Sequence, residues 1–162
     1  MNTTIGNPSG TNDKISEMET TRSRLSTLWI FVMFNYLYCD VVALMDPGLL
    51  KQFLVGNVGG MQINQGFLLG AAILMEIPIS MVLLSRLLKY GANRWANIIA
   101  GVIMTAVQFS SLFFGSSPTI YYIFFSVIEI GCTALIVWYA WKWADPDRRP
   151  MKNTLIAQEN LK

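Results

Sequence analysis

The chain has 162 residues, of which 53% are hydrophobic and only 14% are charged, whereas about a quarter of the residues in an average soluble domain are charged. Its net charge of +2 comes from basic residues spread along the chain, a pattern that does not favour nucleic acid as a partner. Histidine is absent, which excludes His-ligated haem and the commonest general base.

The first segment, residues 1–24, is polar and contains Asp13, Glu17 and Glu19. It lacks the basic start and the small-residue cleavage site of a signal peptide, and its composition predicts a disordered tail. Four apolar stretches follow, each close to the ~20 residues that cross a bilayer as a helix. They cover residues 25–45, 67–88, 96–114 and 120–141.

Short connections force neighbouring stretches to run antiparallel. The sequence therefore predicts an all-α fold, a membrane four-helix antiparallel bundle over residues 25–143 that is followed by a tail over residues 144–162. The longest connection begins with Asp46 and Pro47, a typical N-cap and first helical residue. We expect residues 47–55 to form a short helix on the external membrane surface, and residues 56–66 to form a glycine-rich turn.

The basic residues are strongly asymmetric across this arrangement. Of the 12 Lys and Arg residues, all except Lys51 fall at the two termini or between the second and third stretches. The positive-inside rule then places both termini in the cytoplasm of a multi-pass inner-membrane protein. The lipid bilayer is the expected partner, and a membrane-protein partner or a homo-oligomer remains open.

Each predicted span carries a polar residue near mid-depth, with Asp40 closer to the external end. A charged side chain at the centre of a membrane helix costs about 2.5–3.5 kcal/mol, so we expect these groups to meet inside the bundle. The candidate ligand-binding or proton-binding residues are Asn35, Asp40, Glu76, Ser80, Gln108, Glu129 and Thr133.

Glu76 and Glu129 also occupy the same position in a weak internal repeat, in which residues 75–80 match residues 128–133. The repeat predicts two hairpins related by an axis along the membrane normal. No basic residue lies at the depth of the two glutamates. Their carboxyl groups are therefore either protonated and hydrogen-bonded or bound to a cation; alternatively, they only join helices through polar contacts.

Four sequence blocks carry a resemblance to a known group. These are RLSTLWI at 24–30, EIPI at 76–79, NRWANI at 93–98 and VWYAWKW at 137–143. They resemble small bacterial four-helix membrane proteins that are grouped as a domain of unknown function. The layout is also distantly similar to that of DoxX-like proteins. The resemblance implies the bundle and assigns no activity.

Three function classes follow from the sequence. The first is a small transporter or ligand-binding bundle with a carboxylate site at the membrane midplane. The second is an accessory or assembly subunit of a larger membrane complex, which the DoxX-like layout implies. The third, an enzyme acting on lipid or quinone, has little support, because the chain has no C-x-x-C pair and no His. We predict no catalytic residue, cofactor or metal.

Overall fold

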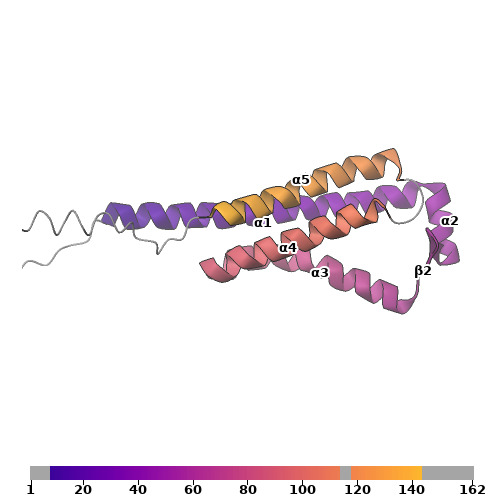
Figure 1. Ribbon diagram of the computed structural model, residues 1–162, viewed down its shortest axis with the longest axis horizontal. Helices are drawn as coiled ribbons and strands as arrows, with labels where there is room; N and C mark the ends of the chain where they lie inside the picture. The colour runs from indigo at the N-terminus through magenta and orange to yellow at the C-terminus, as the bar shows by residue number, and fades with distance from the viewer. Residues whose placement is uncertain (1–7, 114–117, 144–162) are drawn as a thin grey trace, which may run out of the picture.

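The computed structural model describes residues 8–113 and 118–143. These residues form five helices and one two-stranded hairpin: α1 (Pro8–Met45), α2 (Pro47–Val55), β1 (Asn57–Val58), β2 (Met61–Gln62), α3 (Gln65–Leu87), α4 (Tyr90–Ser111) and α5 (Ile120–Lys142). The all-α prediction is confirmed. The four long helices extend along the molecule, and α2 and the hairpin cap the end opposite the start of α1 (Figure 1).

The long helices pack in a ring in which α1 and α4 each contact both α3 and α5. The buried side chains recur at alternating spacings of three and four residues, the pattern with which antiparallel helices pack. On α1 this seam consists of Leu25, Trp29, Val32, Tyr36 and Cys39. On α5 it consists of Ser126, Glu129, Thr133, Ile136 and Ala140.

The protein is a membrane protein by the length and hydropathy of its helices. Three segments are long and apolar enough to cross a bilayer: Ile15–Met45, Gln65–Leu87 and Ile120–Lys142. Helix α4 is not among them, although it has 22 residues, because it carries Asn93, Asn97 and Gln108. All three of these polar side chains are buried against the other helices.

The short helix over residues 47–55 is confirmed as α2. The carboxylate of Asp46 accepts hydrogen bonds from the backbone N–H groups of Gly48 and Leu49, so it satisfies donors that the first helical turn leaves free. Gly56 ends the helix with φ 74°, a conformation that favours glycine. The location of α2 on the membrane surface stays a prediction.

The glycine-rich segment after α2 contains a β-hairpin that the sequence analysis treated only as a turn. Asn57 pairs with Gln62 and Val58 pairs with Met61. Gly59 and Gly60 form the two-residue loop with φ values of 57° and 85°, and positive φ at both positions is the requirement of the tight turn that closes a hairpin.

A disordered tail was expected over residues 1–24, but residues 8–24 belong to α1, which begins at Pro8; residues 1–7 lie outside the described residues. Met18 packs against the core, and the guanidinium of Arg22 donates to the carbonyl of Leu88 at 2.9 Å. The extension is therefore held by the end of α3. Helix α4 likewise begins at Tyr90, earlier than the expected residue 96. The expected tail over 144–162 lies outside the described residues.

A buried polar cluster joins three helices at the end of the molecule where α3 passes into α4. The side-chain oxygen of Asn97 accepts hydrogen bonds from the indole of Trp29 at 2.8 Å and from the hydroxyl of Ser85 at 3.1 Å. Its amide nitrogen donates to the side-chain oxygen of Asn93 at 2.7 Å, and the amide of Asn93 donates to the carbonyl of Ser85. We call Trp29, Ser85, Asn93 and Asn97 the asparagine cluster.

Further contacts surround the asparagine cluster. The guanidinium of Arg86 donates to the hydroxyl of Ser26, and that hydroxyl lies 2.8 Å from the carbonyl of Val82. The phenol of Tyr90 donates to the carbonyl of Trp143 at 2.8 Å, which ties the start of α4 to the end of α5. This end of the molecule is therefore cross-linked through all four long helices.

Replacing Asn97 with Ala should destabilise the protein, because it leaves the buried donors of Trp29 and Ser85 without an acceptor. We expect a loss of about 1–3 kcal/mol of unfolding free energy, measured as the midpoint of denaturant-induced unfolding in detergent micelles. Ser80→Ala is the matched control, since the Ser80 hydroxyl bonds only to the carbonyl of Ile77 on its own helix. Equal unfolding midpoints for the two variants would contradict this role of Asn97.

Candidate carboxylate site

The carboxyl group of Glu129 is the least satisfied polar group in the interior. The side chain lies on the packed face of α5 and is 1% exposed. Within the part of the chain that the structure describes, neither Oε1 nor Oε2 has a hydrogen-bond partner. A buried, ionised carboxylate without partners is strongly unfavourable, so this position favours a bound proton or a bound cation.

Tyr36 contributes a second unsatisfied oxygen to the same region. Its side chain is 6% exposed on the packed face of α1, and its phenol oxygen has no hydrogen-bond partner among the described residues. Tyr36 and Glu129 are near enough to interact electrostatically, yet they do not bond to each other. A small ligand or water between them would therefore find polar partners on two helices.

Helix α4 fixes α5 on both sides of Glu129 without reaching its carboxyl group. The amide of Gln108 donates to the hydroxyl of Ser126 at 2.8 Å, one turn before Glu129. The hydroxyl of Thr105 donates to that of Thr133 at 2.8 Å, one turn after it. Thr133 also donates to the backbone carbonyl of Glu129. These bonds set the register of α5, while the carboxyl oxygens remain available.

Asp40 on α1 acts electrostatically on Glu129. Glu129 in turn acts on Tyr36 and Cys39 of α1 and on Tyr122 and Cys132 of α5. None of these groups carries a positive charge. Among the described residues, no basic side chain acts on Glu129 as a counter-ion.

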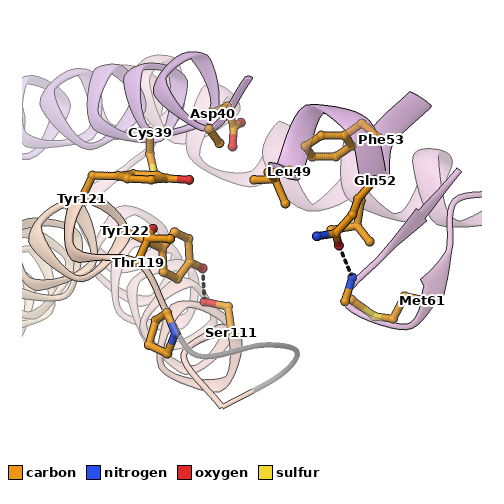
Figure 2. Close-up of a pocket in the computed structure, with 14 residues that line it drawn as sticks. Cys39, Asp40, Leu49, Gln52, Phe53, Met61, Ser111, Thr119, Tyr121 and Tyr122 are labelled. Atoms are coloured by element: carbon orange, nitrogen blue, oxygen red, sulfur yellow. Dashed lines mark hydrogen bonds between the residues drawn. The ribbon is translucent and has the colours of Figure 1, made fainter. Parts of the chain in front are cut away.

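A cavity of about 320 Å³ lies at the α2 end of the molecule, between α1, α2, the hairpin and the start of α5. Figure 2 shows Asp40 and Cys39 entering it from α1, Leu49 from α2, and the ring of Tyr121 extending beneath Cys39. The phenol of Tyr122 donates to the hydroxyl of Ser111 at 2.6 Å in the wall. The cavity thus combines apolar and aromatic walls with a carboxylate.

Glu129 is not itself among the residues that line this cavity. Cys39, Asp40 and Tyr122 line it, and the same three residues interact electrostatically with Glu129. Tyr122 and Glu129 lie on one side of α5 and are about 10 Å apart along its axis, because seven residues make two helical turns. Glu129 therefore lies about two turns deeper than the cavity wall.

Glu76 does not join this site, which corrects the expectation that the two glutamates meet. Glu76 is exposed, whereas the buried residues of α3 are Pro78, Met81 and Ser85. Two residues correspond to about 200° around a helix, so Glu76 points almost opposite to Pro78. The asparagine cluster determines this orientation by holding Ser85 inward.

The other expected residues are distributed between the site and its surroundings. Gln108 and Thr133 flank Glu129, and Asp40 lines the cavity. Asn35 is buried but donates to the carbonyl of Phe31 on its own helix. Ser80 lies on α3 away from Glu129, and its hydroxyl bonds to Ile77.

Sequence reasoning missed Tyr36, Tyr122 and Ser126. The available signal was the alternating spacing of three and four residues that places Tyr36 on the seam of α1, and Ser126 on the seam of α5. Within residues 15–113 and 118–143, no three side chains of His, Cys, Asp or Glu come together as a set that could hold a metal ion.

A comparison with protein families matches residues 13–149 to a family described as "Family of unknown function (DUF6326)". The chain belongs to this family. The resemblance to a family of unknown function is thereby confirmed, whereas the DoxX-like layout has no support from the comparisons. Comparisons with curated proteins and with solved structures found no match.

Proposed function

We propose that this protein is a small membrane transporter or ligand-binding protein in which Glu129 takes up and releases a proton or a cation. The observation that carries the proposal is the burial of Glu129 with both carboxyl oxygens unpartnered. Structural polar groups in this protein behave differently: Asn93, Asn97 and Gln108 are buried and hydrogen-bonded. Buried ionisable groups in membrane helices commonly belong to ion or proton pathways.

The cavity supplies the route to Glu129 in this proposal. Asp40 at its wall attracts a cation or proton, and aromatic rings favour cationic ligands over anionic ones. Tyr36 then offers the phenol oxygen as a second partner beside Glu129. Because proton and cation compete for one carboxyl group, binding of one would release the other, which is the elementary step of coupled transport.

The proposal includes a topology with four spans and with both termini in the cytoplasm of the inner membrane. Helix α4 supports a fourth span, because its polar side chains face inward while Trp95, Ile99, Val102 and Phe109 are exposed. Arg22 and Arg94 form hydrogen bonds at the end that carries the asparagine cluster, whereas Lys51 lies on α2 at the opposite end. The positive-inside rule would then direct the cavity to the external side.

Reporter fusions test this topology. Fusions at residues 58, 92, 117 and 155 should report outside, inside, outside and inside, as four spans require. If α4 did not cross the membrane, residue 117 would report inside and residue 155 outside. That result would overturn the four-span topology.

Replacing Glu129 with Gln should abolish proton exchange, because Gln keeps the size and hydrogen-bonding capacity of Glu but cannot titrate. In vesicles with purified protein, proton flux driven by a potassium diffusion potential should fall to the level of empty vesicles. The infrared spectrum of the variant should lack one titrating protonated-carboxyl band of the wild-type spectrum, the band that belongs to Glu129.

Glu76→Gln is the matched control, since it makes the same chemical change on a membrane helix away from the cavity. It should leave proton flux and the Glu129 infrared band unchanged. If Glu129→Gln retained both wild-type signals, Glu129 would be a structural contact. The accessory or assembly subunit of a larger membrane complex would then be the better functional assignment.

A further inference from the structure

Glu76 occupies an unusual position for a carboxyl group in a membrane helix. It is the central residue of α3 (Gln65–Leu87), eleven residues from each end, and therefore lies about 16 Å from both. Its side chain is exposed on the face opposite the buried residues Pro78, Met81 and Ser85. The neighbouring outward side chains are Leu69, Ala72, Ile79 and Leu83.

The surrounding part of α3 is also uncovered. None of residues 65–77 is buried, and Figure 1 shows this half of α3 diverging from α1 toward the hairpin. Pro78 lies inside α3, where the missing backbone N–H and the proline ring weaken the helix. Residues 65–73 of this candidate membrane span are thus all exposed, while Leu74, Met75 and Ile77 still pack against the core, and the carboxyl group of Glu76 points away from it.

Lipid alone is a poor environment for this surface. A carboxyl group at the bilayer centre is too far from either interface for its short side chain to reach water. The Ser80 hydroxyl, one turn away, donates to the carbonyl of Ile77 rather than to Glu76. Among the described residues no side chain hydrogen-bonds to Glu76, so a polar partner from another chain would stabilise it.

We infer that the outward face of α3 is the contact surface for a second copy of this chain, with Glu76 at its centre. A protonated carboxyl group is self-complementary, since it contains one donor and one acceptor, and two facing glutamates can share a proton. Two copies inserted in the same orientation place their Glu76 side chains at the same depth. A two-fold axis along the membrane normal therefore brings Glu76 to Glu76.

The neighbours of Glu76 suit this contact. Ala72 and Ser80, one turn before and one turn after, are small enough to let two helix backbones approach closely. Leu69 and Leu83 then flank the carboxyl pair and exclude water and lipid from it. The interface lies on the face of α3 turned away from the bundle, so it is independent of the Glu129 proposal.

Disulfide trapping tests the surface. In a Cys39→Ala/Cys132→Ala background, Leu83→Cys should form a disulfide-linked dimer when the purified protein is oxidised in vesicles. Val102→Cys is the matched control, because it is equally exposed on the outward face of α4, and it should remain monomeric. Equal trapping at the two positions would overturn the assignment of the α3 face.

Counting copies by single-molecule photobleaching over a series of protein-to-lipid ratios tests the role of the carboxyl group. Glu76→Gln, which keeps a donor and an acceptor, should dimerise like the wild type. Glu76→Leu should dimerise roughly tenfold more weakly, a change that corresponds to about 1.4 kcal/mol. Wild-type monomers at every ratio, or undiminished dimerisation of Glu76→Leu, would refute the inference. So would cross-linking of Leu83→Cys only to a different protein in native membranes.

Discussion

The side chain of Asn97 connects three helices through hydrogen bonds that have no access to water. Trp29 on α1, Ser85 on α3 and Asn93 on α4 all contact it, and all are buried. In a bilayer, apolar side chains do not drive helices together, because lipid tails are as apolar as leucine. Directional polar contacts therefore determine which helices meet and in which rotation. Asn97 fixes the rotation of α3, and with it the faces on which Ser85 and Glu76 lie.

The two ends of the molecule differ in which buried polar atoms lack partners among the described residues, and at the end with the asparagine cluster these are the Nε atoms of Arg22 and Arg94. Around the asparagine cluster, side-chain amides and hydroxyls pair with one another and with free carbonyls at the helix ends. Toward α2, Glu129 and Tyr36 keep buried oxygens without partners, and a cavity opens beside them. The hydrogen bonds of the asparagine cluster, which join three helices, thus lie at one end, and the proposed ligand chemistry lies toward the other. Such a division allows the open end to respond to a ligand while the cross-linked end preserves the fold.

The helices could be predicted from the sequence largely because their signals are local. Apolar length indicates α3 and α5, and the Asp46 cap with Pro47 indicates both the start and the existence of α2. The predictions that failed depend on contacts between residues far apart in the sequence. The residues before Leu25 look like a polar tail, yet they continue α1, because Met18 and Arg22 find contacts on the folded chain.

The candidate site could also be predicted only in part from local sequence signals. The internal repeat places a glutamate in both α3 and α5, but a repeat in sequence does not determine which way each helix faces. Glu129 is one of the regularly spaced buried residues of α5. Glu76 is not one of the buried residues of α3, and its position on that helix turns its side chain outward. Spacing relative to the seam, rather than depth in the membrane, was the informative quantity. By their predicted depth in the membrane alone, Glu76 and Glu129 are equivalent.

The low hydropathy of α4 affects the order in which the helices can enter the membrane. Its buried amides lower its hydropathy below that of the other long helices, while the neighbours that satisfy those amides lie on α1, α3 and α5. An isolated α4 would expose Asn93, Asn97 and Gln108 to hydrocarbon, and partition poorly from the translocon. Insertion of α4 is therefore favourable only once α1 and α3 are present to receive it. In the proposed four-span topology, the least apolar span enters the bilayer as a consequence of assembly, not as its first step.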